Sequence, residues 1–215
     1  SISGVSYNQD LAVLNGRVVA GRDDKKLAIT LSAFNKEAKA INDAELEKID
    51  SPAFSYDAKI EKEFETAKAP VDQHLTLKVG AQVMLCRNDP ARRWANGTLG
   101  VVSKLEENKI YVRFEGGQEH AIPMTSWENC KYIYDPKTKS AEKKVIVTFI
   151  QYPLKLAWAI TIHKSQGLTF DRMILDLTHG IFMPGQLYVA LSRVRSLKGL
   201  TLSNPVKQSY VWQSK

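Results

Sequence analysis

The sequence has no long hydrophobic run. Of its 215 residues 44% are hydrophobic, which is enough for one or two packed domains. No stretch reaches the ~18 consecutive apolar residues that a membrane span needs, so we expect no membrane partner. The start, SISGVSYNQDLAVLNG, lacks a basic segment followed by an apolar core, so no secretion signal is expected. The absence of an initial Met hints at a piece of a longer protein.

Cysteine and histidine are scarce and scattered. Cys86 and Cys130 match no metal-ligand spacing, and the four histidines form neither an HExxH motif nor a cluster with cysteine. We therefore expect no metal site. Buried free thiols in a reducing cytosol are favoured over a disulfide, and we expect a cytoplasmic protein, associated with the nucleoid if the source is bacterial.

Acidic residues are outnumbered by basic ones. Thirty Lys and Arg stand against 23 Asp and Glu, which gives a formal net charge of +7. This charge would aid an approach to phosphate polymers. Many proteins without a nucleic-acid role are equally basic, so charge alone supports nucleic-acid binding only modestly.

The first part of the chain has an α/β pattern. Residues 26–31 are typical of a short buried strand, and residues 34–47 have helical spacing with Asn35 as a candidate N-cap. Residues 48–74 are charged and aperiodic and contain two prolines. We expect them to form a long connection with little regular structure.

A β-rich block follows from Leu75. Short strand-like runs alternate with turn signals such as Asn-Gly and Gly-Gly. The expected strands are 79–86, 98–104, 109–114, 118–122, 131–134 and 145–150, with a solvated, lysine-rich hairpin tip at 136–144. Regularly spaced short strands predict a small closed or nearly closed barrel.

The last part returns to alternating helix and strand. We expect helices at 154–166 and 185–197, and strands at 172–177 and 200–203. An α/β pattern interrupted by a β-only block is best explained as an insertion. The expected domains are an α/β domain made of 1–76 and 151–215, and an inserted barrel at 77–150.

In the segment Ala157–Asp171, an expected helix with an apolar body ends in a polar cluster at a helix-to-loop turn. Short hydroxyl, cationic and amide side chains at such a turn can grip phosphates, and Gly167 lets a ligand approach the backbone. The clustered residues are Thr161, His163, Lys164, Ser165 and Gln166. Composition alone favours a plainer alternative, a solvated helix end with Gly167 as its C-cap.

A second segment, Gly185–Ser196, combines an apolar stripe with a bordering arginine. Leu187, Ala190, Leu191, Val194 and Leu197 share one helical face and are the expected core stripe. Gln186 and Arg193 border this stripe. A planar, permanently charged guanidinium there suits a nucleotide phosphate bound across an interface. An arginine that merely caps the core is an equal alternative.

The segments TIHKSQGLTFD at 161–171 and GQLYVALSRVRSL at 185–197 resemble the fifth and sixth motifs of superfamily 1 helicases. The branch is the petite-integration-frequency (PIF) and RecD-like one, which moves 5′ to 3′. LKVGAQVMLCRND at 77–89 and WANGTLGVV at 94–102 resemble the approach to that family's inserted barrel, and 29–42 resembles its fourth motif more loosely. The resemblance implies an α/β fold, a RecA-like (P-loop NTPase-type) second motor domain with an inserted small SH3-like β-barrel.

The resemblance also implies roles for single residues. Arg193, the expected catalytic residue, matches the motif-six arginine that reaches the γ-phosphate and stabilises charge developing in phosphoryl transfer. The expected nucleotide-facing residues are Gln186, Gly167, Thr169 and Arg193. The expected residues on the single-stranded DNA side are Thr161, His163, Lys164 and Ser165, which would hold the backbone without reading sequence.

Arginines at the mouth of the expected barrel form a second candidate for DNA contact. Arg87, Arg92 and Arg93 surround Trp94, and Asn96 follows. Arginine beside an aromatic ring can hold a nucleic acid strand by charge and stacking. Packing of Trp94 inside the protein is the favoured alternative for that residue, whereas the arginines remain open to either interpretation.

A motor of this superfamily also needs a GxxxxGK[ST] loop and an acidic partner for magnesium. The sequence contains neither a Gly-Lys pair nor an Asp-Glu pair. ATP and Mg²⁺ would therefore be held mainly by a first motor domain absent from this chain. We expect the parent protein to be an ATP-dependent DNA helicase, and these residues alone to lack ATPase activity.

The leading hypothesis is the C-terminal motor half of a monomeric helicase that acts on single strands and DNA junctions. The resemblance places such proteins in DNA repair, recombination and telomere maintenance. Two alternatives stay open: a stand-alone nucleic-acid-binding module without motor activity, and a protein-interaction module built on the barrel.

Overall fold

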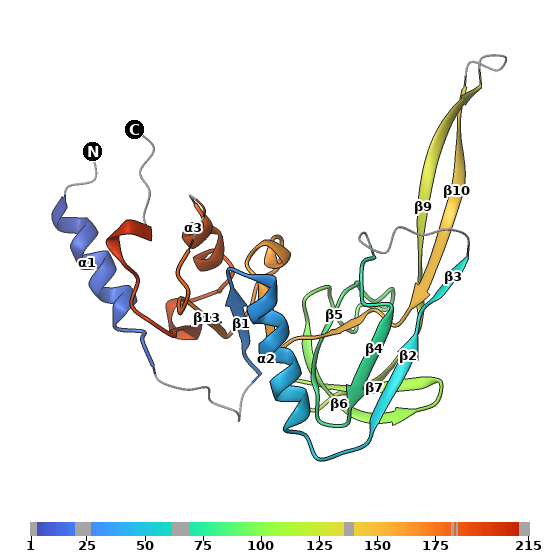
Figure 1. Ribbon diagram of the computed structural model, residues 1–215, viewed down its shortest axis with the longest axis horizontal. Coiled ribbons are helices and arrows are strands. Elements are labelled where there is room, and N and C mark those ends of the chain that lie inside the picture. The colour runs from blue at the N-terminus through green and yellow to red at the C-terminus, as the bar shows by residue number, and fades with distance from the viewer. Residues whose placement is uncertain are drawn as a thin grey trace. The chain divides into compact units, whose positions relative to one another are not determined.

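The chain divides into two compact units (Figure 1). The computed structural model describes residues 4–19, 27–61, 69–135, 140–181, 183 and 185–210. Unit 1 comprises residues 1–48 and 156–215, and unit 2 comprises residues 49–155. The β-rich block thus interrupts an α/β unit, and unit 2 as a compact body runs from Ile49 to Lys155. The domain boundaries 1–76, 77–150 and 151–215 remain predictions.

A parallel sheet of four strands forms the centre of unit 1. Its order is β12-β1-β13-β14, and every adjacent pair is parallel. The strands are β1 (Ile29–Ser32), β12 (Ala159–Thr161), β13 (Met173–Leu175) and β14 (Leu200–Leu202). Their residues are mostly buried, because a parallel sheet is covered on both faces and its strands read as apolar runs.

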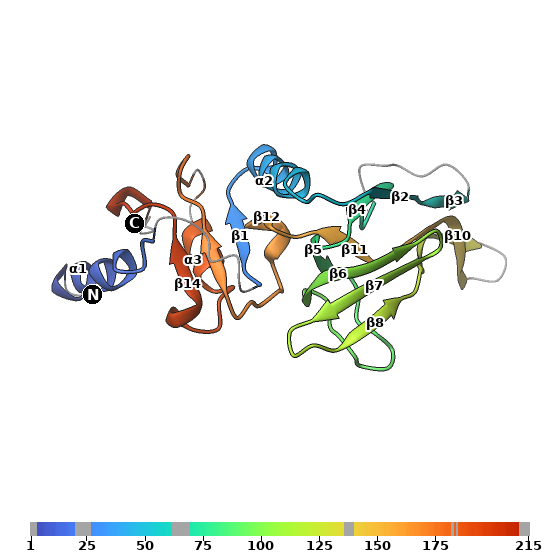
Figure 2. The same ribbon diagram turned by 90° about the horizontal axis from the view of Figure 1, so that it is seen from below.

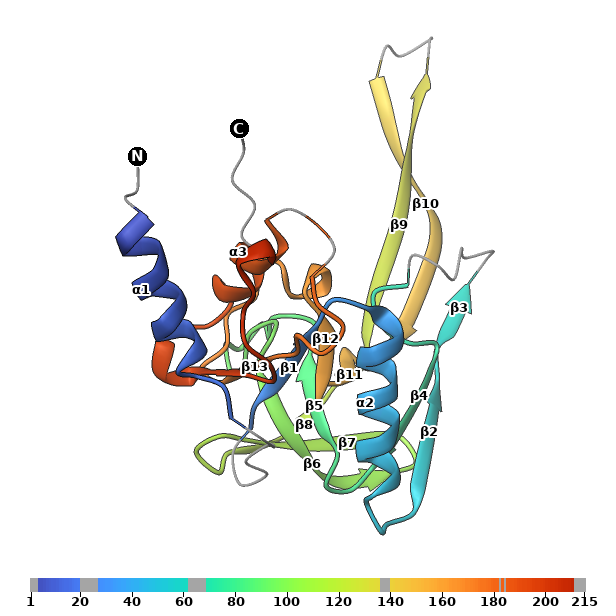
Figure 3. The same cartoon turned by 60° about the vertical axis from the view of Figure 1, so that its left-hand side comes forward.

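The described residues of unit 1 also form three α-helices and three short 3₁₀ turns. They are α1 (Gly4–Asn15), α2 (Asn35–Glu47), α3 (Gln186–Leu191), η2 (His163–Ser165), η3 (Leu197–Gly199) and η4 (Gln208–Tyr210). Helix α2 packs against β12 and β1, as Figure 3 shows. The Asn42 side chain fixes it there: Nδ2 donates to the Ala159 carbonyl at 2.8 Å, and Oδ1 accepts from the Ala159 N–H at 2.9 Å.

The helix expected at 154–166 is wrong. This segment forms β11 (Leu154–Leu156), then β12, then η2. Periodicity cannot separate a buried strand from a buried helix in a short apolar run. Here Ile160, Thr161 and Ile162 are β-branched, which favours a strand, and β1 supplies the backbone partners.

The helix expected at 185–197 is too long. Helix α3 ends at Leu191, and the chain then turns to make an isolated parallel bridge between Val194 and Phe170. The Phe170 N–H donates to the Arg193 carbonyl at 2.7 Å, so the backbone after Ser192 finds partners outside the helix. Leu197, expected in the core, is 43% exposed.

Other local expectations also need correction. The N-cap of α2 is Phe34, whose N–H donates to the Ser32 hydroxyl at 3.2 Å, and Asn35 is the first helical residue. Helix α1 was not predicted. Neither were β2 (Ala53–Asp57) and β3 (Lys59–Glu61), which lie in the expected loop at 48–74. In β2, four of the five residues are exposed, so the apolar pattern that signals a strand is weak.

Unit 2 is built from β-strands. A five-stranded sheet has the order β11-β5-β6-β7-β8 (Figure 2), with β5 (Gln82–Leu85), β6 (Leu99–Glu106), β7 (Lys109–Phe114) and β8 (Glu119–Ile122). The predicted strands there are confirmed. Strands β9 (Thr125–Asp135) and β10 (Ser140–Gln151) pair as a long antiparallel ribbon, with β3 on the edge of β10. Strand β4 (His74–Lys78) pairs with β2.

The β9–β10 ribbon is longer than predicted. Residues 140–144, expected in the hairpin tip, belong to β10, and residues 136–139 lie outside the described part of the chain. Closure of unit 2 as an SH3-like barrel stays a prediction.

A buried glutamine holds three parts of unit 2 together. Gln151 is fully buried. Its Nε2 donates to the carbonyl oxygens of Tyr56 at 2.9 Å and Gln73 at 3.0 Å, and its Oε1 accepts from the Tyr152 N–H at 2.9 Å. A buried amide must find such partners because an unsatisfied polar group is costly. Gln151 therefore fastens the end of β10 to β2 and to the segment before β4.

The described residues form neither a membrane-spanning helix nor a metal-ligand cluster. They contain no helix that is both long and apolar enough to cross a membrane. They also contain no group of three or more His, Cys, Asp or Glu side chains that could hold a metal ion.

Candidate nucleotide and nucleic-acid interface

The carboxyl ends of the four parallel strands meet at one edge of unit 1. In open α/β sheets, ligands bind outside this edge. The segments that leave it are 162–168 after β12, 33–37 after β1, 176–180 after β13 and 203–204 after β14. The residues in 161–165 that were predicted to contact single-stranded DNA therefore lie where such a fold places a ligand.

A tight turn at residues 165–168 follows η2. Gln166 has φ −58° and ψ 133°, Gly167 has φ +78°, and the Leu168 N–H donates to the Ser165 carbonyl at 3.0 Å. These angles define a type II turn, which requires a positive φ at its third residue. A Cβ on Gly167 would meet nothing within 4 Å, so the backbone conformation, and not lack of space, requires glycine. Gly167 is thus not the C-cap of a helix.

The residues predicted to contact single-stranded DNA are of two kinds, buried and exposed. Thr161 is 4% exposed and Ser165 is fully buried. The Thr161 hydroxyl accepts from the Lys164 N–H at 3.3 Å, and the Ser165 hydroxyl donates to the Ile162 carbonyl at 2.6 Å. These two hydroxyls bond to the backbone of η2, which leads into the 165–168 turn. His163 and Lys164 are exposed, and neither forms an ion pair with a carboxylate of the described residues.

Arg193 is held by neutral oxygens alone. Its Nε donates to the Val189 carbonyl at 3.1 Å, its Nη1 to the Leu168 carbonyl at 3.3 Å, and its Nη2 to the Ser192 hydroxyl at 2.7 Å. A guanidinium has five N–H groups, so one on Nη1 and one on Nη2 remain. No described carboxylate pairs with Arg193, whereas Arg195 contacts Asp171 at 3.4 Å. The half-buried charge of Arg193 is therefore not neutralised within the described chain.

The remaining predicted nucleotide-facing residues lie close to these elements. Gly167 and Thr169 are exposed on the segment that carries Leu168. Gln186 is the half-buried first residue of α3, after Gly185 with φ +75°. Arg193 lies two residues beyond the end of α3, so Gln186 and Arg193 do not share one continuous helical face.

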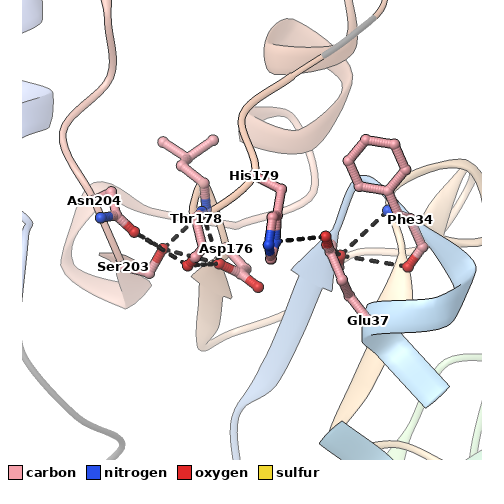
Figure 4. Close-up of polar contacts among 9 residues, drawn as sticks. Phe34, Glu37, Asp176, Thr178, His179, Ser203 and Asn204 are labelled. Atoms are coloured by element: carbon pink, nitrogen blue, oxygen red, sulfur yellow. Dashed lines mark hydrogen bonds and ion pairs between the residues drawn. The ribbon is translucent and has the colours of Figure 1, made fainter. Parts of the chain in front are cut away.

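A polar cluster at the same edge, shown in Figure 4, was not predicted from the sequence. The His179 Nδ1 lies 2.6 Å from Glu37 Oε1. The Asp176 carboxylate accepts from the hydroxyls of Thr178 at 2.7 Å and Ser203 at 3.1 Å. The sequence carried a signal for this cluster, because each of its residues follows the carboxyl end of a strand. Since its anionic groups are carboxylates, this part of the edge is unsuited to phosphate.

In unit 2, Arg93 is engaged by a buried carboxylate. The Arg93 Nε and Nη2 donate to the two oxygens of Asp89 at 2.7 and 2.8 Å, and its backbone N–H donates to Oδ2 at 3.1 Å. The Asp89 side chain is 1% exposed. The hydrogen bond from Arg93 is the main reason that the pKa of Asp89 is lowered to about 2. The charge of Arg93 is therefore largely compensated.

The aromatic neighbour of Arg93 belongs to the core. Trp94 is 7% exposed, stacks on Phe114 with ring centres 5.7 Å apart, and lies 4.6 Å below the Arg93 guanidinium. The preferred interpretation of Trp94 as a packed residue is confirmed. It offers no open ring to a nucleic acid base.

Two neighbours of Arg93 point toward solvent. Arg92 is exposed and has φ 58°, in the left-handed region. Asn96 is also exposed, and its N–H donates to the Asn88 side chain at 2.7 Å. Arg87 is fastened by a bond from Nη1 to the Ser126 carbonyl at 2.8 Å. Arg92, Arg93 and Asn96 thus share one loop in unit 2, while the residues 161–165 belong to unit 1.

Known proteins are similar to part of unit 2 and to most of the chain. The family described as "DNA helicase Pif1, 2B domain" matches residues 66–105, in unit 2. ATP-dependent DNA helicase Pif1 of Bdellovibrio bacteriovorus is 44% identical over 144 residues, covering 66% of this chain and 30% of that protein. The protein of the same name from Campylobacter jejuni is 30% identical over 192 residues, covering 84% of this chain and 43% of that protein.

Solved structures are similar over nearly the whole chain. Unliganded Pif1 from Bacteroides sp. is 36% identical with a TM-score of 0.86, covering 94% of this chain and 47% of that one. Bacteroides Pif1 bound to single-stranded DNA has a TM-score of 0.74 at the same identity, covering 96% and 47%. The chain thus spans less than half the length of these relatives. By its RecA-like domain with a small β-domain and by these similarities, the chain is the C-terminal part of a Pif1-like superfamily 1 helicase.

Proposed function

We propose that this chain is the C-terminal motor half of an ATP-dependent 5′-to-3′ DNA helicase. In this proposal Arg193 is an arginine finger for ATP held by a first motor domain outside the chain. The observation that carries the proposal is the guanidinium itself, which is half-buried, oriented by three neutral oxygens, and without a described carboxylate partner. A bound phosphate would supply the missing anion through charge-assisted hydrogen bonds.

The chemistry assigned to Arg193 is electrostatic. Charge that develops on the transferred phosphoryl group is stabilised by a fixed cation, with little reorganisation during the reaction. Bacteroides Pif1, at 36% identity, has a structure described as a complex with ADP-AlF4, which supports nucleotide use in the parent protein. ATP and Mg²⁺ would be held mainly by the first motor domain, since these residues contain neither a Gly-Lys nor an Asp-Glu pair. We expect no ATPase activity from this chain alone.

For single-stranded DNA we propose direct contacts from His163 and Lys164. Both are exposed beside the 165–168 turn, and cationic side chains hold phosphates without reading bases. Thr161 and Ser165 would act by shaping η2, which carries His163 and Lys164, because their side chains are buried and their hydroxyls already bonded. Gly167, Thr169 and Gln186 would face the nucleotide side.

The loop of unit 2 would supply a second contact. Arg92 and Asn96 are its exposed members, whereas Arg93 would contribute less because Asp89 compensates its charge. The same proposal includes DNA junctions as substrates, a monomeric state, a cytoplasmic location, and a role in DNA repair, recombination or telomere maintenance.

The arginine finger is tested in the full-length protein with Arg193→Ala. We expect DNA-stimulated ATP turnover to fall by at least about a hundredfold, with affinity for a labelled oligo-dT close to wild type. Arg195→Ala is the matched control, because that exposed arginine already pairs with Asp171. Normal turnover in Arg193→Ala would show that the arginine only caps the core.

The DNA contact is tested by titrating oligo-dT at several salt concentrations. Lys164→Ala should weaken binding most at low salt and reduce the slope of log affinity against log salt by about one. Lys207→Ala removes an exposed charge that has no assigned contact and should leave both quantities unchanged. No detectable binding by the wild type at low salt would instead favour the protein-interaction alternative.

A further inference from the structure

We infer that Ser192 is a positioning residue for Arg193, which is a role that rests on the proposed function of the arginine. The two side chains are directly bonded: Arg193 Nη2 lies 2.7 Å and Nε lies 3.2 Å from Ser192 Oγ. Ser192 is the exposed C-cap of α3. It therefore touches the guanidinium from the side of the helix end.

The orientation of the hydroxyl is determined by its own donor bond. Ser192 Oγ donates to the Val189 carbonyl at 2.8 Å. A hydroxyl has one hydrogen and two acceptor lone pairs, so with the hydrogen directed to Val189 the lone pairs serve the guanidinium. Ser192 is thus an oriented acceptor, and its contact with Arg193 is not the incidental result of adjacency in sequence.

A second acceptor approaches from another segment. The Leu168 carbonyl, at the end of the 165–168 turn, receives a hydrogen bond from Arg193 Nη1 at 3.3 Å. Two terminal nitrogens bound to two acceptors define the plane of the guanidinium. The second N–H of Nη1 and the second N–H of Nη2 then point in fixed directions, as bidentate recognition of a phosphate requires.

Removal of the hydroxyl would release one of these two anchors. Nε would keep the Val189 carbonyl at 3.1 Å and Nη1 the Leu168 carbonyl at 3.3 Å, but Nη2 would lose its acceptor, so the guanidinium would be held less firmly at that nitrogen. Arginine has many rotamers, and misorientation of a catalytic group by a small distance lowers the rate strongly. The charge would persist while its placement would not, so the effect should appear in kcat and not in DNA affinity.

The test is a double-mutant cycle on ATP turnover in the full-length protein. Ser192→Ala should lower kcat about tenfold, which corresponds to about 1.4 kcal/mol of lost transition-state stabilisation, with the KM for ATP and the Kd for oligo-dT unchanged. Ser192→Thr, which keeps the hydroxyl, should restore turnover. Ser196→Ala removes an exposed hydroxyl that makes no side-chain hydrogen bond with the described residues, and should behave as wild type.

The decisive comparison uses Arg193→Ala as background. If Ser192 acts through Arg193, adding Ser192→Ala to that variant causes no further loss. An equal loss in both backgrounds, or normal kcat in Ser192→Ala, would overturn the inference while leaving the arginine finger intact. Normal turnover in Arg193→Ala would instead defeat the proposed function. Should Ser192→Ala not fold, Ser192→Cys replaces the hydroxyl with a weak acceptor and carries the same expectations.

Discussion

Gly199 lies directly against the backbone of Asp171. A Cβ placed on residue 199 would come within 1.9 Å of the Asp171 carbonyl oxygen, a distance that two non-bonded atoms cannot keep without movement of one of them. The conflict is with backbone, which cannot rotate away as a side chain can. Glycine at 199 therefore lets η3 pack against the end of the segment that carries the 165–168 turn.

Gly199→Ala should destabilise unit 1. Overpacking against a fixed backbone atom should lower the free energy of unfolding by about 2 kcal/mol or more, measured by urea unfolding of the isolated chain. Gly16→Ala is the control, because a Cβ there meets its nearest atom, the Val13 carbonyl oxygen, at 3.4 Å. Equal unfolding midpoints for the two variants would contradict the packing described here.

Gln151→Leu should destabilise unit 2. The substitution keeps the approximate size of the buried side chain but leaves the Tyr152 N–H without its acceptor and removes a donor from the Tyr56 carbonyl. An unsatisfied buried N–H group costs about 1–3 kcal/mol, which should appear as a lower free energy of unfolding in urea. Gln118→Leu changes an exposed glutamine of the same unit and should be near neutral. A neutral result for Gln151→Leu would show that water replaces the amide.

Protonation of Asp89 should make the free energy of unfolding depend on pH. Its pKa is lowered from 3.8 to about 2 in the folded chain, chiefly by the hydrogen bond from Arg93. A lowered folded pKa contributes stability above about pH 4, and this contribution is lost as the pH falls toward 2. Asp89→Asn should therefore flatten the decline in unfolding free energy between pH 4 and 2. Asp50→Asn, at an exposed carboxylate of unit 2, should keep the wild-type slope. An unchanged slope in Asp89→Asn would argue against the ion pair.

Cys86 should be unreactive in the folded protein. Burial raises the pKa of its thiol from 9.0 to about 11, and the thiolate is the nucleophile in alkylation. In a Cys130→Ser background, iodoacetamide at pH 8.5 should modify Cys86 much more slowly in buffer than in urea. The same shift means that the free energy of unfolding falls as the pH rises above about 9. Equal alkylation rates in both solvents would refute this burial.

Strands β6 and β7 could be predicted because their residues alternate between buried and more exposed positions. The strand Lys109–Phe114 was predicted to the residue. Strand β12 has three buried residues and no alternation, so its neighbours, not its own pattern, decide its conformation. Likewise α3 ends early because Phe170, distant in sequence, bonds to the Arg193 backbone.

The candidate site shows a similar division. Arg193 and the turn around Gly167 were found through motifs that carry their own sequence signal. The pairing of Asp89 with Arg93 and the orientation of the Ser192 hydroxyl depend on side-chain positions. A short polar residue at an exposed helix end has no sequence pattern that distinguishes an anchor from a solvated group, so neither relationship could be predicted.

The paired hydrogen bonds between Asn42 and Ala159 have a consequence for solubility. Strand β12 is the outermost strand of its sheet as described, and the backbone groups of Ala159 face away from β1, where another chain could add a strand. The Asn42 amide occupies both of them and thus imitates one residue of a neighbouring strand. A single side chain from α2 thus covers the outward-facing backbone groups of Ala159, and changing Asn42 would expose them to pairing with another chain.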